Sequence, residues 1–130
     1  MLLYHYTTSG FLPRIDENGL QPHVPDPEYL TQGQPVVWLT TELEQPAWLL
    51  LNPATGDPVC IQVTLDPNSK RLAHYATWFQ KKSLFSSTGE VFTGEDLLKY
   101  LSPGQLAAWY VYFGNVRRNR LVLPDYTIVD

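Results

Sequence analysis

Leu2-Leu3-Tyr4-His5-Tyr6-Thr7-Thr8 is the stretch around which we expect the rest of the chain to assemble. Successive side chains of an extended segment point to opposite faces, so Tyr4 and Tyr6 share one apolar or amphipathic face. His5 and Thr7 share the other face, which has a more mixed polarity. The pattern predicts a half-buried strand whose histidine points away from its aromatic side chains.

The composition describes the kind of domain to which this strand belongs. With 130 residues, of which 44% are hydrophobic and 17% charged, the chain is long enough to bury one core and predicts a single globular domain over residues 1–130. Eleven prolines and eight glycines indicate many turns between short elements, and 13% aromatic residues indicate a core of large flat side chains. We therefore expect an α+β domain and not a helical bundle.

Charge and cysteine content exclude several classes of protein. The net charge of −4 argues against non-specific binding of nucleic acid. The cluster of Arg117, Arg118 and Arg120 is either a local basic patch that binds nucleic acid or a solvated hairpin. The single Cys60 excludes an internal disulfide framework, and no Cys/His spacing suggests a metal site. The start of the sequence lacks the pattern of a leader peptide, and no apolar run is long enough to span a bilayer. We expect a cytoplasmic protein with no membrane contact.

Working outward from the first strand, apolar spacing predicts a helix from Gly10 to Gly19 that buries Phe11, Leu12 and Ile15. Pro13 fits its first turn, and Gly19 suits a C-terminal residue with positive φ. Residues 21–34, rich in proline and acids, are interpreted as a loop, either a lid beside His5 or an ordinary surface excursion. Further strands are expected at Pro35–Thr41, Val59–Leu65, the start of Arg71–Phe79, Glu90–Phe92, Tyr110–Phe113 and Leu121–Leu123, with helices starting near Thr41, Thr93 and Ser102.

The opening Leu3-Tyr4-His5-Tyr6-Thr7-Thr8, with Gly19-Leu20-Gln21-Pro22 and Val37-Trp38-Leu39-Thr40-Thr41, resembles small bacterial proteins of the ADP-ribosyltransferase-like superfamily. DNA-modifying toxins and RNA 2′-phosphotransferases of that superfamily have similar openings. The likeness covers about the first third of the chain. It implies a split, mostly antiparallel sheet with short helices and a cleft that holds NAD.

The resemblance also implies roles for individual residues. His5 would hydrogen-bond a ribose hydroxyl of NAD, because a neutral imidazole offers one donor and one acceptor. Threonines of the second strand would shape the floor of the cleft, and an aromatic ring, Tyr6 or Tyr75, would stack on the nicotinamide. The implied NAD-contacting residues are His5, Tyr6, Thr7, Thr40, Thr41 and Tyr75. On composition alone, His5 is equally a partly buried strand residue with one hydrogen-bond partner.

In such folds a carboxylate stabilises the positive charge that develops on the ribose as nicotinamide departs. Glu90, an acid preceded by glycine at the start of a late strand, is the preferred candidate. Glu42, directly after the second strand, is the alternative, although it also fits a structural role at a helix N-terminus. Tyr6 stands where relatives commonly have glycine.

Three functions remain open from the sequence. The first is NAD-dependent transfer of ADP-ribose to a protein or nucleic-acid acceptor, as in a bacterial toxin, phage effector or defence protein. The second is a non-catalytic binding protein or inhibitor of a host protein on the same scaffold. The third is RNA 2′-phosphate transfer, for which only Arg71 and the late arginine cluster are available to hold a phosphate.

Overall fold

The computed structural model describes residues 1–25, 31–43, 51, 53–79, 83–85, 91–93 and 107–124. Its elements are β1 (Leu2–Thr8), η1 (Ser9–Phe11), α1 (Leu12–Asn18), β2 (Val37–Thr40), η3 (Pro53–Thr55), β3 (Pro58–Thr64), β4 (Leu72–His74), α2 (Tyr75–Phe79), β5 (Ser83–Phe85), β6 (Val91–Thr93), β7 (Trp109–Tyr112), η4 (Arg118–Arg120) and β8 (Leu121–Val122). Among these residues no helix has both the length and the apolar character needed to cross a bilayer.

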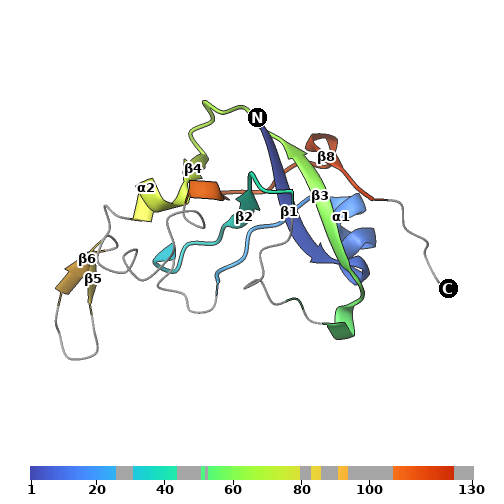
Figure 1. Cartoon of the computed structure of the whole chain (residues 1–130), viewed down its shortest axis with the longest axis horizontal. Helices are drawn as coiled ribbons and strands as arrows, with labels where there is room; N and C mark the ends of the chain where they lie inside the picture. Colours follow the sequence, from blue (N-terminus) through green and yellow to red (C-terminus); the bar gives the residue numbers. More distant parts are fainter. Residues whose placement is uncertain are drawn as a thin grey trace.

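The main sheet has six antiparallel strands in the order β4-β7-β2-β1-β3-β8 (Figure 1). The expected α+β class is therefore confirmed, with few and short helices. β1 lies inside the sheet and pairs with β3 along its whole length, from Leu2 opposite Thr64 to Thr8 opposite Pro58. β5 and β6 form a separate two-stranded sheet.

One face of the sheet is covered by α1, which lies beside β1 and β3 in Figure 1. Leu3 of β1 and Ile61 and Val63 of β3 are fully buried on this face, against Leu12 of α1. Leu2, on the opposite face, is 49% exposed. The face with mixed polarity in the sequence, which carries His5, is thus the face of β1 that packs into the core.

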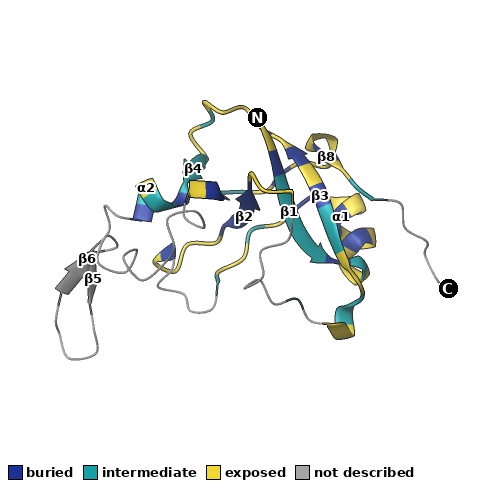
Figure 2. Cartoon of the chain, viewed as in Figure 1, coloured by how far each residue is buried: buried dark blue, intermediate teal, exposed yellow. Residues whose placement is uncertain are grey.

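A second core cluster forms around β2, β7 and α2. In antiparallel pairs, directly opposed residues point to the same face, and Trp38 lies opposite Val111. Both belong to a cluster with Tyr75 and Phe79 of α2 and with Trp109. Figure 2 shows β2 as a largely buried strand, whereas most of β1 is half-buried and burial alternates along the second half of β3. Trp38 itself is half-buried, with its ring 4.7 Å from that of Tyr75.

The first helix ends as predicted, and its start differs. Gly19 has φ 74° and ψ −168°, a conformation that is essentially restricted to glycine, and its N–H donates to the Ile15 carbonyl oxygen at 2.8 Å. Pro13 lies in the first turn of α1, where the missing N–H is not needed. Phe11, however, is 39% exposed instead of buried, because it belongs to the 3-10 turn that precedes α1.

Later segments both confirm and correct the expectations. The strands β3, β7 and β8 lie where alternation and β-branched residues predicted them. The segment Arg71–Phe79, ambiguous in sequence, contains the expected strand, β4, followed directly by α2. β5 lies at Ser83–Phe85, where no strand was expected from the sequence. The helices expected near Thr41, Thr93 and Ser102 fall mainly outside the described residues.

Candidate functional site

β1 and β2 are neighbours in the sheet, and they part after a single pairing. Within the described residues, their ladder consists of Tyr4 opposite Thr40. β1 continues to Thr8 and is paired with β3 throughout, so its second half has no strand partner on the side that faces β2. The sheet therefore opens between these strands from His5 onward.

The side chain of His5 spans this opening. Its Nδ1 lies 2.8 Å from the carbonyl oxygen of Trp38 in β2. A carbonyl oxygen can only accept a hydrogen bond, so Nδ1 carries the proton and donates it. In the neutral ring, Nε2 is then a hydrogen-bond acceptor. The imidazole thus joins β1 to β2 where the backbone ladder does not.

Burial lowers the pKa of His5 below its usual value of 6.5. The hydrogen bond to Trp38 opposes this shift in part, and the nearby His23 adds to it through like-charge repulsion. The ring is therefore neutral at physiological pH. Nε2 has no hydrogen bond to any described residue, and the described residues contain no buried side-chain nitrogen or oxygen without a partner. Nε2 is accordingly accessible to a solute.

A pocket of about 390 Å³ occupies the opening between the two strands. This volume lies in the range of small-molecule sites. It is lined by residues of β1, the η1–α1 turn, the segment after Gly19 and the start of β2: His5, Thr7, Phe11, Arg14, Ile15, Gly19, Leu20, Gln21, His23, Pro25, Val36, Val37 and Trp38. The described part of the loop from residue 21 therefore lies at the rim beside His5, as expected of a lid.

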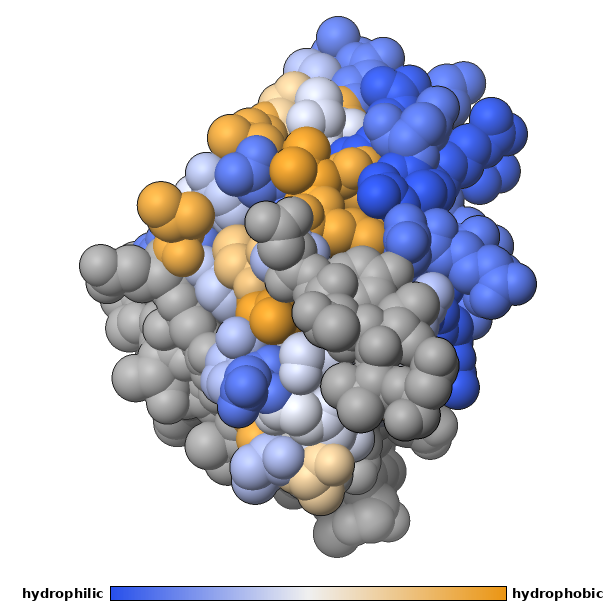
Figure 3. All heavy atoms as spheres, turned by 90° about the vertical axis from the view of Figure 1, so that its right-hand side faces the viewer, coloured by the Kyte–Doolittle hydropathy of each residue, from blue (hydrophilic) through white to orange (hydrophobic). Residues whose placement is uncertain are grey.

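The pocket combines apolar walls with groups that favour an anion or a hydroxyl. Arg14 is its cation, and the imidazoles of His5 and His23 are its other ionisable groups among the described lining residues. No described aspartate or glutamate lines it. Seen from the side on which α1 and β8 lie, apolar residues gather in the middle of the surface and hydrophilic residues along one edge (Figure 3).

The other NAD-contacting residues implied by the sequence are not all brought to this pocket. Thr7 lines it, whereas Tyr6 points to the opposite face, where its hydroxyl donates to the Glu42 carbonyl oxygen at 3.0 Å. Burial, foremost, raises the pKa of the Tyr6 phenol. Thr40 is buried, and its hydroxyl accepts a hydrogen bond from the Glu42 N–H at 3.1 Å.

Thr41 and Tyr75 also lie away from the lining of the pocket. Thr41 is exposed after β2, and its N–H donates to the Ala108 carbonyl oxygen at 3.0 Å. Tyr75 is buried in the second core cluster, with its ring 4.7 Å from that of Trp38 and 5.2 Å from that of Phe79. Its ring faces are therefore used in packing.

Glu42, the alternative candidate for the catalytic carboxylate, is not among the described residues that line this pocket. Glu90 lies outside the described residues. Glu42 is exposed after β2, and its backbone oxygen receives the Tyr6 hydroxyl. Within the part of the chain that the structure describes, no group of three or more His, Cys, Asp or Glu side chains is arranged to hold a metal ion.

Arg14 and His23 line this pocket, although the sequence alone did not single out either of them as a site residue. Arg14 follows Phe11 by three positions, a spacing that puts both on one helical face. This spacing of an aromatic residue and a cation was the signal available in the sequence. His23 reaches the pocket because its N–H and carbonyl oxygen each bond Val36 at 3.0 Å, which holds the loop against the start of β2.

In comparisons with models of protein families, with curated proteins and with solved structures, no match was found.

Proposed function

We propose that the pocket between β1 and β2 binds the nicotinamide–ribose part of NAD, and that the protein transfers ADP-ribose to a protein or nucleic-acid acceptor. The observation that carries the proposal is His5, a neutral imidazole with Nδ1–H committed to Trp38 and an accessible acceptor at Nε2. Such a group accepts a hydrogen bond from a ribose hydroxyl. The opening of the sheet at this position fits the split sheet expected of an ADP-ribosyltransferase-like domain.

The other lining residues suit the same ligand. Phe11 and the apolar wall from β2 offer a surface for the flat nicotinamide ring, and Arg14 supplies positive charge for the phosphates of the dinucleotide. Thr7, on the same face as His5, offers a second hydroxyl contact. These residues bind and orient NAD; none of them is a carboxylate.

The transfer itself breaks the bond between the ribose C1 and the nicotinamide nitrogen, whose electron pair leaves with nicotinamide. An acceptor oxygen or nitrogen then bonds C1 and loses its proton. Glu90 remains the proposed carboxylate that stabilises the positive charge on the ribose and receives or directs this proton.

The test is NAD binding together with nicotinamide release. Free NAD at a hundred times its Kd raises the free energy of unfolding by about 2.7 kcal/mol, which a thermal melt detects. We expect both stabilisation and nicotinamide release. Stabilisation without release would favour the non-catalytic alternative, which the missing carboxylate among the described lining residues supports. No stabilisation at millimolar NAD would reject the proposal.

A further inference from the structure

A second pocket lies where the loop between β3 and β4 meets the loop between β7 and β8. The two loops are joined by a hydrogen bond from the Phe113 N–H to the Arg71 carbonyl oxygen, at 2.8 Å. The pocket has a volume of about 480 Å³. The described residues that line it are Leu65, Asp66, Ser69, Lys70, Arg71, Tyr112, Asn115, Val116, Arg117, Asn119 and Arg120.

Positive charge dominates this pocket, although the whole chain has a net charge of −4. Lys70, Arg71, Arg117 and Arg120 are its cations, and Asp66 is its one described carboxylate. Asp66 accepts a hydrogen bond from the Asn68 N–H at 2.9 Å, within its own turn. No described carboxylate forms an ion pair with any of the four cations. The positive charge at the pocket is therefore not neutralised by the described part of the chain.

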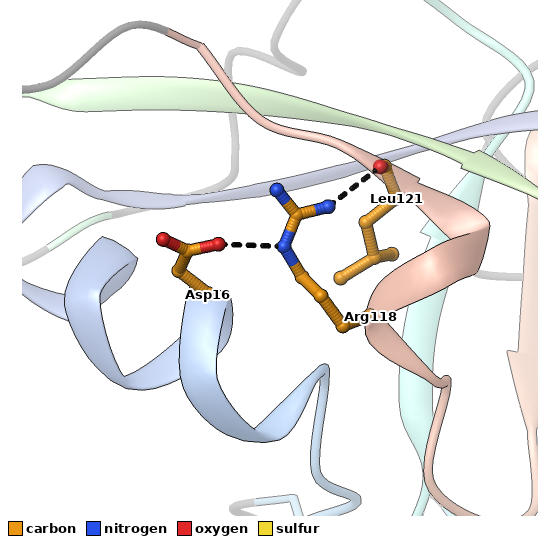
Figure 4. Close-up of polar contacts among 3 residues, drawn as sticks. All are labelled: Asp16, Arg118 and Leu121. Carbon is orange, nitrogen blue, oxygen red and sulfur yellow. Dashed lines mark hydrogen bonds and ion pairs between the residues drawn. The ribbon is translucent and has the colours of Figure 1, made fainter.

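The neighbouring Arg118, in contrast, is held by partners within the chain. Its Nε lies 2.7 Å from the Asp16 carboxylate in α1, and its Nη1 donates to the Leu121 carbonyl oxygen at 3.0 Å (Figure 4). Arg118 thus fastens η4 to α1 and does not line the pocket. The late arginine cluster is divided: its middle member is structural, and Arg117 and Arg120 line the pocket.

Gly114 helps to place the guanidinium of Arg71. It has φ 150°, and a Cβ at this position would lie 3.0 Å from Nη1 of Arg71. The absence of a side chain lets the guanidinium lie close to the backbone of the β7–β8 loop. Cations from two loops therefore converge on one volume, although they are far apart in sequence.

We propose that this pocket binds a compact polyanion, the phosphate or pyrophosphate group of a nucleotide. A guanidinium can donate two parallel hydrogen bonds to the oxygens of one phosphate. The volume of the pocket also suits a small ligand. Proteins that bind a nucleic-acid strand use an extended basic groove with stacking aromatics. Here the cations surround a single pocket in an acidic protein, which favours a compact group. The site shares no lining residue with the His5 pocket and does not depend on NAD binding there.

The experiment is calorimetric titration at low ionic strength with inorganic pyrophosphate, ADP and a single-stranded oligonucleotide. Pyrophosphate and ADP should bind. Arg117→Gln/Arg120→Gln should weaken binding of pyrophosphate by at least about 10-fold, because charge-assisted hydrogen bonds are lost. Arg71→Gln, in the other loop, should weaken it as well, and Arg117→Lys/Arg120→Lys should retain most of it. Arg14→Gln removes one positive charge from the His5 pocket, where it serves NAD, and should weaken pyrophosphate binding less than Arg71→Gln does.

Several outcomes would overturn the proposal. One is the absence of pyrophosphate binding by the wild type. Another is loss of binding in Arg14→Gln with wild-type affinity in the Arg71 and Arg117/Arg120 variants, which would place the anion in the His5 pocket. A third is a wild type that binds the oligonucleotide but not pyrophosphate, which would show that these cations bind the phosphate backbone of a nucleic-acid strand. Arg71→Gln and Arg117→Gln/Arg120→Gln alter different loops. If one of these variants fails to fold, the other still tests the proposal.

Discussion

The Nδ1 of His5 and the carbonyl oxygen of Trp38, 2.8 Å apart, join β1 to β2 through a side chain at the place where the two backbones part. One contact therefore has two consequences. It fixes the tautomer of a neutral imidazole, and it stabilises the edge of the opening that forms the pocket.

The lowered pKa of His5 predicts how stability depends on pH. Well above pH 6.5, His5 is neutral in the folded and unfolded states, so its contribution to folding is fully present. As the pH falls below 6.5 toward the lower folded pKa, the unfolded state takes up the proton first, and the free energy of unfolding decreases by up to about 1.4 kcal/mol per pH unit. Denaturant titrations at several pH values measure this slope.

The His5→Gln variant should reduce that slope between about pH 7 and pH 5. His74→Gln is the matched control, because His74 lies outside the pocket and bonds Thr77 and the Ala107 carbonyl oxygen. An unchanged slope in His5→Gln would show that another group is responsible.

The two proposed functional residues should fail in different ways. His5→Ala removes a hydrogen bond to NAD that is already formed when NAD is bound, so it should mainly weaken NAD binding. Glu90→Gln keeps the shape of the side chain but removes its charge, so turnover should fall by about 10²–10³ with little change in NAD affinity. Nicotinamide release and NAD titration measure both. Equal turnover in Glu90→Gln and wild type would redirect attention to Glu42.

Trp38→Ala should cost less than the replacement of a fully buried aromatic residue in the same cluster. Trp38 is half-buried against Tyr75 and Trp109, with ring distances of 4.7 and 5.9 Å. Phe79 is 1% exposed, so Phe79→Ala should cost about 3–5 kcal/mol, and Trp38→Ala should fall at or below the lower end of that range. Chemical denaturation gives both values. A larger loss for Trp38 than for Phe79 would contradict this order.

Two glycines with nearly equal φ differ in the room that they leave for a side chain. Gly19 and Gly33 have φ values of 74° and 75°, but a Cβ at Gly19 would collide with the Val116 carbonyl oxygen, whereas one at Gly33 would meet no atom within 4 Å. Gly33→Ala should therefore cost about 1 kcal/mol from strain alone, and Gly19→Ala clearly more. Similar losses in denaturation midpoint would show that the Gly19 turn adjusts.

The sequence predicts well those elements whose patterns are local. Alternation identified β3, Gly19 identified the C-terminal end of α1, and the two-residue period put His5 on the face of β1 opposite to its tyrosines. The pocket was harder to predict from the sequence, because its residues come together only when particular strands become neighbours in the sheet. Nothing local in the sequence shows that Arg14 of α1 and His23 converge on His5, since that follows from the order of strands and from the His23–Val36 bridge.

The two faces of β1 illustrate a further limit. Tyr4 and Tyr6 made one face look like the apolar side, but α1 covers the face of Leu3 and His5. The aromatic rings carry hydroxyl groups that reach the surface, as the Tyr6–Glu42 contact shows. Amphipathic aromatics are compatible with either face, so only the packing decides between them.

The position of β1 within the sheet also has a consequence for how the chain folds. The terminal ammonium of Met1 donates to the Leu65 carbonyl oxygen at 2.7 Å, across 64 positions, and His5 reaches Trp38 across 33. During synthesis β1 is therefore made well before either neighbouring strand. Its backbone N–H and C=O groups have no strand partner until those strands follow. Closing such long loops slows folding relative to a domain with local contacts, toward the millisecond-to-second range. Until β3 has been synthesised, the strand that carries His5 has unpaired edges that can pair with another chain.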